Sequence, residues 1–427
     1  MDLGSTLCKA AACDAHGQIR SSGHTPSPPG PDGPGPDARE LEAWWQAARR
    51  AVACCLIGLG PGRTRIRALG VSCRYFAGVF LDAADHPVPA GPAEPGWRET
   101  PEVREVYEAG GWGSAGPLAC GYGPILVGAA RRLRHRHPNL HRRVHRVGAL
   151  HDYIVLRLTG AWVTDYATGP GGPAWPDTAT RLAGVEPSAF PAPLPMHARA
   201  GPLQPESAVD LGLVRGIPVA VGGQDGACAN FGAGAVEPGD GCITLSTNTV
   251  VRIVTGAPVP GEFGYVIAPS GRWAWVRGVP GAGRALDAVV AALDGGPIPA
   301  ESSRHRALTL RDRPGDVPRV LDLPEPDNLR IAPGVRLLRA RGYAPEAIYA
   351  GAVDDVVTAI MGLVGKARSR GGTARRYVLT GGMTGAPLLC ERLAAALGAR
   401  EIHTVREAAA LGAAQLAAIA ASAPGST

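Results

Sequence analysis

A strand, a glycine-rich turn and a helix follow one another without a break near the C-terminal end of the chain. Residues 376–380 (RYVLT) are mostly apolar, residues 381–385 (GGMTG) form the turn, and residues 387–398 (PLLCERLAAALG) have helical spacing. Upstream, residues 217–221 (IPVAV) form a short apolar strand that is also followed by two glycines. Such units are typical of an α/β layer, so the chain is predicted to be an α/β protein.

The length of the chain favours two domains. A chain of 427 residues exceeds the size at which a single hydrophobic core usually stops growing. A second β-rich stretch begins at Gly241 (CITLSTNTVVRIV), and we predict domains 1–235 and 236–427. Residues 21–37 (SSGHTPSPPGPDGPGPD) are predicted to form an exposed loop, because proline removes backbone donors and glycine adds chain entropy.

Charge, cysteine content and hydrophobicity indicate which compartment and which partners to expect. A net charge of +6 is modest for this length, so nucleic acid is not favoured. Nine cysteines without a CxxC pair indicate buried thiols in a reducing compartment. The start MDLGSTLCKA has no apolar signal core, and residues 408–421 are too short to span a bilayer. We therefore expect a cytoplasmic protein with no membrane partner, and a homodimer is one assembly that the sequence leaves open.

The segment 131–146 (RRLRHRHPNLHRRVHR) is strongly basic. Its four histidines are candidates for binding a metal or a polyanion, and nucleic-acid binding here would weaken steeply with salt. No cysteine or carboxylate in the segment completes a closed metal set. A solvated basic helix end and loop is the favoured interpretation.

An acidic residue opens a turn of small residues at the start of the chain. The turn and its surroundings combine a carboxylate, a flexible glycine, two hydroxyl groups and a cation: Asp2, Gly4, Ser5, Thr6 and Lys9. Backbone N–H groups of such a turn can bind phosphate while the carboxylate recruits Mg²⁺, which prefers oxygen ligands. An ordinary hairpin is the alternative interpretation.

A second carboxylate, Asp225, follows the apolar strand at residues 217–221. A phosphoryl acceptor needs a base within hydrogen-bond reach, and such a base contributes roughly 10²- to 10⁴-fold in rate. The glycines before Asp225 let a ligand approach the backbone. The alternative is a turn aspartate that caps a helix beginning at Ala227.

Two turns in the second half of the chain have the composition of nucleotide-binding loops. Residues 246–249 (STNT) lie in an otherwise apolar run and are candidates for holding a phosphate. Gly381, Gly382 and Met383 precede a helix and can admit a nucleotide. Each turn is a weak signal alone, but their order along the chain is informative.

Taken in order, these segments resemble the FGGY carbohydrate kinases, relatives of actin and of the Hsp70 ATPase domain. The resemblance rests on DLGSTLCKAAACDAHG, GVSCRYFAGVFLDAADHPV, LHDYIVLRLTGAWVTDYATG, IPVAVGGQDGACANFGAGAVEPGDGCITLSTNTVVR, LTGGMTGAPLLCERLAAALG and EAAALGAAQLAA. They look like the first phosphate loop, the sugar-contacting turn, the helix with its TD segment, the base motif with the second phosphate loop, the adenosine motif and the closing helix. The resemblance implies two actin-like (ribonuclease H-like) ATPase domains with an interdomain cleft.

The resemblance also implies a role for each candidate residue. Asp225 is implied as the general base, and Asp2 as the residue at the Mg²⁺ and phosphate end. The implied ATP contacts are Gly4, Ser5, Thr6, Lys9, Thr247, Asn248, Thr249, Gly381, Gly382 and Met383.

The residues implied to contact the carbohydrate depart from the family pattern. The implied substrate contacts are Arg74, Tyr75, Trp97, Arg98, Gln224 and Asp225. The usual Trp-x-Asp-x-Arg element reads WRETP at residues 97–101, so the identity of the carbohydrate stays open. Arg74 favours an anionic or densely hydroxylated substrate, with a surface cation as the alternative. The base segment looks most like the gluconate and xylulose kinase branch.

We therefore expect an enzyme that uses Mg·ATP to phosphorylate a hydroxyl of a sugar, sugar acid, polyol or cyclitol. The altered substrate element motivates an alternative, a catalytically degenerate relative that binds a sugar or a nucleotide in a regulatory role. Met1 stands where the first strand of the family should be ending, so we expect either an upstream start or a shortened strand.

Overall fold

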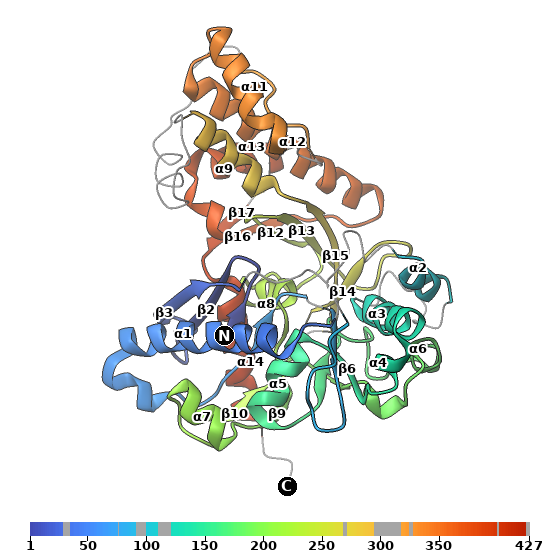
Figure 1. Cartoon of the computed structure of the whole chain (residues 1–427). Helices are drawn as coiled ribbons and strands as arrows, with labels where there is room; N and C mark the ends of the chain where they lie inside the picture. Colours follow the sequence, from blue (N-terminus) through green and yellow to red (C-terminus); the bar gives the residue numbers. More distant parts are fainter. Residues whose placement is uncertain are drawn as a thin grey trace. The chain divides into compact units, whose positions relative to one another are not determined.

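The protein divides into two compact units in the computed structural model (Figure 1). The structure describes residues 1–28, 35–75, 77–90, 100–109, 121–267, 271–293, 317–323, 328–398 and 401–423. Unit 1 contains Met1–Val236, Gly256–Ala274 and Glu407–Thr427, and unit 2 contains Glu237–Thr255 and Trp275–Arg406. The expected domains 1–235 and 236–427 are continuous, whereas two later segments of the chain pack with unit 1.

Unit 1 is built on a five-stranded mixed sheet in the order β11-β4-β1-β2-β3. Its strands are β1 (Asp2–Leu3), β2 (Leu7–Cys13), β3 (Ile19–Pro26), β4 (Ser72–Cys73) and β11 (Gly223–Gln224). The other strands of this unit are β5 (Ala77–Leu81), β6 (Arg146–Ala149), β7 (Val163–Asp165), β8 (Ala192–Leu194), β9 (Arg199–Pro202), β10 (Pro218–Ala220) and β14 (Gly264–Ile267). Its helices are α1 (Ala38–Leu59), α2 (Pro101–Glu108), α3 (Gly123–Arg136), α4 (Pro138–His141), α5 (Leu150–Thr159), α6 (Asp177–Ala183), α7 (Pro205–Leu211), α8 (Asp225–Gly232) and α14 (Ala408–Ser422).

Helices α1 and α14 cover opposite faces of this sheet. Successive side chains of a strand point to opposite faces. Along β2, Cys8, Ala10 and Ala12 are buried in the same core cluster as the inward residues of α1. On the other face, Lys9 contacts Glu407 at the start of α14. The sheet is therefore covered on both sides, and its strand ends are left to form a site.

The proline-rich segment 21–37 is not all loop. Its first residues, 21–26, form all but the first two residues of β3, where Ser21 pairs with Ala12 and Pro26 pairs with Leu7. The loop prediction was wrong for these residues because β3 is the edge strand of its sheet. An edge strand needs backbone partners on one side only and tolerates proline. Residues 29–34 lie outside the described part of the chain.

Unit 2 is built on a second mixed sheet that contains the strand order β15-β13-β12-β16-β17. β12 pairs parallel with β16 and β16 parallel with β17, while β13 pairs antiparallel with β12. The strands are β12 (Asp240–Thr244), β13 (Thr249–Thr255), β15 (Arg272–Val279), β16 (Arg376–Thr380) and β17 (Glu401–Val405). The helices are α9 (Ala282–Leu293), α11 (Asn328–Ala340), α12 (Pro345–Ser369) and α13 (Pro387–Leu397). The predicted α/β class and the strand, turn and helix at residues 376–398 are confirmed.

Helix α12 is the one helix of the described residues that is long and apolar enough to cross a membrane by length and composition. Its most apolar window has a mean hydropathy of 1.6, but 56% of that window is buried inside the protein. This burial is the pattern of a helix in a protein core.

Helix α8, which begins at Asp225, packs against α14 through two glycines. A Cβ atom on Gly232 would lie 2.0 Å from Ala408 O, and one on Gly412 would lie 2.0 Å from Cys228 O. Neither position admits a side chain unless the helices move apart. The position of α8, and of Asp225 with it, therefore depends on α14.

We expect Gly412→Ala to lower the free energy of unfolding by about 1–3 kcal/mol, which is the usual cost of overpacking. Chemical denaturation followed by circular dichroism measures this change. Gly172→Ala is the matched control, because nothing lies within 4 Å of its Cβ position. An equal loss of stability in both variants would contradict the close contact between α8 and α14.

Candidate functional site

Three neighbouring strands of unit 1 run parallel and end at one edge of the sheet. β1 and β11 both pair with β4, so Asp2 and Gly223 each lie opposite Ser72. The next residues in this register, one step beyond the ends of the strands, are Gly4, Arg74 and Asp225. Neighbouring strands lie about 4.8 Å apart, so these three positions span about 10 Å. The fold thus brings together a predicted phosphate contact, a predicted substrate contact and the predicted base.

Asp225 is the first residue of α8 and is half-buried. The helix is capped by Gln224, whose Oε1 accepts a hydrogen bond from Ala227 N at 2.9 Å. The capping role that was the alternative for Asp225 therefore belongs to Gln224. Gln224 Nε2 also donates to Asp225 Oδ1 at 2.6 Å, which orients the carboxylate. One end of the Gln224 amide thus caps α8 and the other holds the Asp225 carboxylate. The predicted contact of Gln224 with substrate stays a prediction.

The two glycines before the base are required by close backbone contacts. Gly222 has φ +69°, and a Cβ atom there would lie 1.8 Å from Val71 O. A Cβ atom on Gly223 would lie 2.7 Å from Asp165 Cγ. At this turn the chain leaves β10, which pairs with β9, and enters β11, which pairs with β4. The sequence predicted one strand here, and the left-handed turn at Gly222 explains why there are two.

Asp2 lies beneath the same edge and is only 7% exposed. Its Oδ1 accepts a hydrogen bond from Ser72 Oγ at 2.8 Å. Burial, followed by the negative charge of Asp225, raises the pKa of Asp2 to about 6. A pair of interacting carboxylates is a donor set that a divalent cation would stabilise.

The residues present fit Mg²⁺ through Asp2, because this ion keeps several waters and takes one or two carboxylates along with phosphate oxygens. Over the described ranges, no group of three or more His, Cys, Asp and Glu side chains forms a metal cluster. The role of Asp2 at the metal stays a prediction.

The turn from Gly4 to Thr6 joins β1 to β2 and is held by Ser27. Ser27 Oγ donates to Gly4 O at 2.7 Å, and Ser27 N donates to Thr6 O at 3.0 Å. The side chains of Ser5 and Thr6 are exposed. This turn is a hairpin, as the alternative interpretation held, and its exposed tip also lies at the edge that carries Asp225.

Lys9 points to the face of the sheet that α14 covers. Its Nζ forms an ion pair with Glu407 Oε2 at 2.9 Å. Glu407 has φ +52°, a backbone conformation that is uncommon for a residue with a side chain. The predicted contact between Lys9 and phosphate would require Lys9 to leave or share this carboxylate.

On the substrate side, Tyr75 belongs to a stack of aromatic rings. The rings of Tyr75 and Tyr122 lie 3.9 Å apart at an interplanar angle of 16°, and Phe263 meets Tyr122 edge-on at 5.1 Å. The Tyr75 hydroxyl donates to Tyr122 O at 3.1 Å. The sequence identified Tyr75 and missed the other two rings, because no local pattern links segments so far apart. Trp97 and Arg98 lie outside the described residues, so their substrate contacts stay predictions.

In unit 2, the turn between β12 and β13 contacts the start of α9. Asn248 Oδ1 accepts a hydrogen bond from Gly281 N at 2.8 Å, and Thr247 O accepts one from Gly283 N at 3.2 Å. Asn248 is exposed, whereas Thr249 begins β13 and is fully buried. Of the three predicted phosphate contacts here, Thr247 and Asn248 are therefore the accessible ones.

The glycine turn after β16 meets the same region. Gly381 has φ +98°, and a Cβ atom on it would lie 2.3 Å from Leu245 O. Met383 N donates to Leu245 O at 3.0 Å. A Cβ atom on Gly283 would lie 2.7 Å from Met383 Sδ and 2.3 Å from Ser246 O. The turn also contains Gly382, which is exposed.

Sequence reasoning missed Gly281 and Gly283 in this cluster. The signal was present, because Pro280 and Gly281 lie between a strand and a helix, and Gly283 is the second residue of that helix. Three segments of unit 2 therefore meet around glycines whose missing side chains leave the backbone open to the close approach of a ligand.

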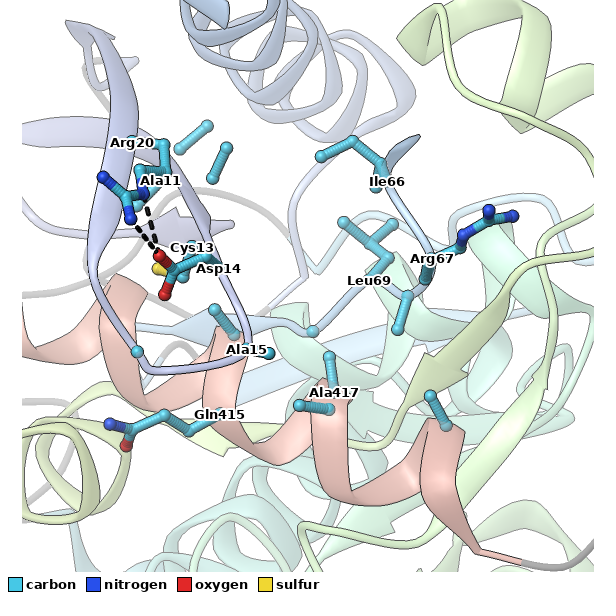
Figure 2. A pocket seen from close by; sticks show the side chains of 18 of the residues that line it. Ala11, Cys13, Asp14, Ala15, Arg20, Ile66, Arg67, Leu69, Gln415 and Ala417 are labelled. Carbon is cyan, nitrogen blue, oxygen red and sulfur yellow. Dashed lines mark hydrogen bonds and ion pairs between the residues drawn. The ribbon is translucent and has the colours of Figure 1, made fainter. Parts of the chain in front are cut away.

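Unit 1 also contains a cavity of about 1200 Å³, shown in Figure 2. Its lining includes Asp14 in the turn between β2 and β3, Arg20 at the start of β3, and Gln415 on α14. It also includes Met1 and Gly70, which precede β1 and β4, so it lies at the opposite ends of the strands from Asp225. No predicted site residue that the structure describes lines this cavity, and the cavity does not mark the site.

The basic segment 131–146 forms the end of α3, α4 and the turn after it. Arg131 forms an ion pair with Glu105, and Arg143 lies 3.8 Å from Asp82. His135 lies 3.9 Å from Glu102. Carboxylates from neighbouring elements thus balance part of its charge, which suits a solvated helix end, and the absence of a nucleic-acid partner stays a prediction.

Part of the sequence is similar to known proteins. Residues 130–232 match the model of the FGGY family of carbohydrate kinases, N-terminal domain. The chain is 29% identical over 122 residues to the gluconokinase of Bacillus subtilis, which is 27% of this chain and 24% of that protein. The matches to the curated gluconokinases therefore span about a quarter of their length.

Solved structures match over nearly the whole chain. The xylulose kinase of Rhodospirillum rubrum has a TM-score of 0.74 and 21% identity, over 98% of this chain and 89% of that one. The glycerol kinase of Plasmodium falciparum with ADP has a TM-score of 0.69 and 14% identity, over 97% and 87%. The two mixed sheets and their helices thus have the fold of the carbohydrate kinases. Residues 130–232 thus resemble the N-terminal domain of the FGGY carbohydrate kinases, and the fold over nearly the whole chain is that of solved carbohydrate kinases.

The raised pKa of Asp2 predicts a cost to stability that depends on pH. The folded state binds the Asp2 proton more tightly than the unfolded chain, whose pKa is about 3.9, so the free energy of unfolding falls as pH rises from about 4 to about 6. In EDTA at pH 7.5 we expect Asp2→Asn to be more stable than wild type, by at most about 3 kcal/mol. Urea unfolding between pH 4 and pH 8 measures the difference, which should shrink toward pH 4.

The matched control for this experiment is Asp177→Asn, which removes an exposed carboxylate from the first turn of α6. A gain in stability that does not vary with pH, or one shared by Asp177→Asn, would contradict the buried, proton-binding state of Asp2.

Proposed function

We propose that the protein transfers the γ-phosphoryl group of ATP to a hydroxyl of a sugar, sugar acid, polyol or cyclitol, with Asp225 as the general base. The observation that carries the proposal is the common register of β1, β4 and β11, which brings Gly4, Arg74 and Asp225 to one edge of a sheet. Ligands commonly bind at the carboxyl ends of parallel strands. The similarity of residues 130–232 to the FGGY carbohydrate kinases supports phosphoryl transfer as the reaction.

Different residues of unit 1 accept the proton, bind phosphate and hold the metal. Asp225 accepts the proton of the attacking hydroxyl, and the amide of Gln224 keeps its carboxylate oriented. The N–H groups of the turn from Gly4 to Thr6 bind phosphate oxygens. Asp2 holds Mg²⁺, which when bound neutralises charge on the phosphates. Most of the rate gain in such a reaction comes from positioning and charge neutralisation.

The residues of unit 2 hold the nucleotide. Thr247 and Asn248 form the accessible part of one turn, and Gly381 and Gly382 form the other. We add Gly283 to this set, because a side chain there would fill the space between the two turns. A structural relative solved with ADP supports a nucleotide as the ligand of this fold.

A sugar acid is the first substrate to test. The guanidinium group of Arg74 suits a carboxylate, with which arginine forms paired hydrogen bonds. The similarity to gluconokinases over 122 residues supports the same choice. Ketoses, polyols and cyclitols complete the panel, with ADP release as the assay.

We expect Asp225→Asn to lower kcat by roughly 10²- to 10⁴-fold, with little change in KM for ATP, because the amide cannot accept the proton. A coupled assay of ADP release measures both constants. Asp177→Asn is the control, because Asp177 is also the first residue of its helix and is exposed on α6. Turnover at the wild-type level in Asp225→Asn would refute the assignment of the base. Binding of sugar and ATP without turnover in the wild type would favour the regulatory alternative.

We expect Gly283→Ala to raise KM for ATP about tenfold or more, since displacing a packed loop costs about 1–3 kcal/mol. The new methyl group would lie 2.3 Å from Ser246 O, so one turn must move. Gly362→Ala on α12 is the control, because nothing lies within 4 Å of its Cβ position. An unchanged KM for ATP in Gly283→Ala would exclude this cluster as the nucleotide site.

A further inference from the structure

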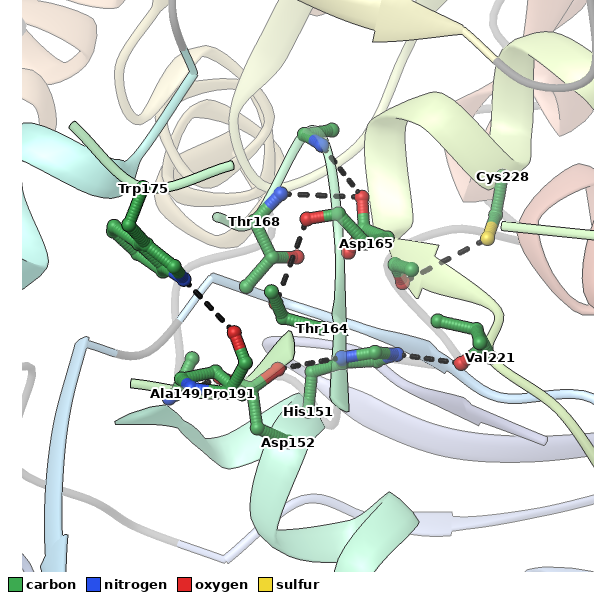
Figure 3. Close-up of polar contacts among 12 residues, drawn as sticks. Ala149, His151, Asp152, Thr164, Asp165, Thr168, Trp175, Pro191, Val221 and Cys228 are labelled. Atoms are coloured by element: carbon green, nitrogen blue, oxygen red, sulfur yellow. Dashed lines mark hydrogen bonds and ion pairs between the residues drawn. The ribbon is translucent and has the colours of Figure 1, made fainter. Parts of the chain in front are cut away.

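A buried histidine, His151, contacts Asp152 and the carbonyl of Val221 (Figure 3). His151 is in the first turn of α5 and is 1% exposed. Its Nδ1 lies 3.0 Å from Asp152 Oδ1, and its Nε2 lies 2.8 Å from Val221 O. A carboxylate and a carbonyl oxygen both accept hydrogen bonds, so each ring nitrogen must donate one. With Asp152 ionised, the geometry therefore calls for a doubly protonated, positively charged imidazolium.

Two buried carboxylates balance this charge. Asp152 and Asp165 are fully buried, and they are the charged groups that face His151. Burial alone would lower the pKa of His151, but the hydrogen bond and charge of Asp152 and the charge of Asp165 raise it above its usual value. Burial raises the pKa of Asp165, and the positive charge of His151 opposes that change. His151, Asp152 and Asp165 therefore form one cluster of interacting charges.

This charged cluster contacts the backbone segment that leads to Asp225. His151 binds the carbonyl of Val221, four residues before Asp225. Asp165 packs against Gly223, two residues before Asp225, so closely that a Cβ atom there would lie 2.7 Å from its Cγ. These charged residues therefore fix residues 221–223, the segment that leads to Asp225.

The Asp165 carboxylate is itself fixed by backbone donors. Its Oδ1 accepts hydrogen bonds from Ala167 N at 2.8 Å and from Thr168 N at 3.1 Å. Asp152 is fixed in the same way, because its Oδ2 accepts from Ala149 N at 2.7 Å. Neither carboxylate can turn away from His151 without losing these bonds.

We propose that His151 is a positioning residue for Asp225. Its imidazolium, balanced by Asp152 and Asp165, fixes the carbonyl of Val221 and thereby the start of α8. This role rests on the proposed function of Asp225 as the base. A neutral imidazole would turn a lone pair toward one of its two acceptor oxygens, so loss of the proton weakens the hold on the strand.

The test uses two variants that keep the shape of the site and remove charge. His151→Gln keeps a donor for Val221 O but carries no charge. Asp165→Asn keeps an acceptor for the N–H groups of residues 167 and 168 and removes the negative charge. A displacement of about 1 Å at a reacting group costs roughly 10²-fold in rate. We expect kcat to fall by about 10- to 100-fold in His151→Gln, with KM for ATP and for the sugar within about threefold.

The pH profile separates positioning from simple stabilisation. Removing the charge of Asp165 lowers the pKa of the imidazolium, so the alkaline limb of kcat should move to lower pH in Asp165→Asn. His141→Gln is the matched control, because His141 Nε2 also lies 2.8 Å from a backbone carbonyl, that of Ala183, but on α4. We expect its kcat and pH profile to match those of wild type.

The protonation state is measured without turnover by ¹⁵N NMR of histidine-labelled protein, with His151→Gln used to assign the signal. Two protonated ring nitrogens at pH 7.5, together with a loss confined to kcat, support the proposal. A neutral tautomer at that pH, or an unchanged kcat in the folded variants, overturns it. If the wild type phosphorylates none of the panel, the kinase assignment and the positioning role fail together, while the NMR signal still decides whether His151 is a charged bridge.

Discussion

The pairing of β4 with a parallel strand on each side determines where the acidic and glycine residues of unit 1 lie. β1, β4 and β11 are each two residues long, so few backbone hydrogen bonds fix their register. Other contacts must support it: Ser72 binds both Met1 O and the Asp2 carboxylate, and Gly222 fits against Val71 with no room for a side chain. A shift of one residue would exchange the faces on which alternate side chains lie. The register is therefore the condition on which the whole strand-end arrangement depends.

Unit 1 buries several carboxylates close to the ends of β1, β4 and β11, and the burial of these charges costs free energy. Asp2, Asp152 and Asp165 are all removed from water, and each is partnered by a hydroxyl, an imidazolium or backbone N–H groups. Buried charges are usually tolerated only when such partners are present. Groups with shifted pKa values also gather at functional sites more often than elsewhere. The concentration of buried charge near the ends of β1, β4 and β11 is thus typical of a functional site.

Local chemistry was predictable from the sequence, and contacts between distant segments were not. The strand, turn and helix at residues 376–398 were predicted because glycine interrupts two clear periodicities. Asp225 was singled out by its place after an apolar strand, and its role as the base was implied by the family resemblance and stays a prediction. In contrast, the role of Gly283 comes from its distance to Met383, and the partner of His151 is Val221, far away along the chain. Residues 21–26 were misassigned because an edge strand has no strong periodicity of its own when it carries proline and glycine.

The order in which the protein is synthesised gives α14 a particular importance. This helix ends at Ser422, yet it packs against α8, whose first residue is Asp225. Domains generally fold as units while the nascent chain emerges from its N-terminal end. Unit 1 cannot complete its packing until residues 408–422 have been synthesised. A polypeptide that stalls or is cut before residue 408 would therefore contain every proposed catalytic side chain and still lack the helix that supports Asp225.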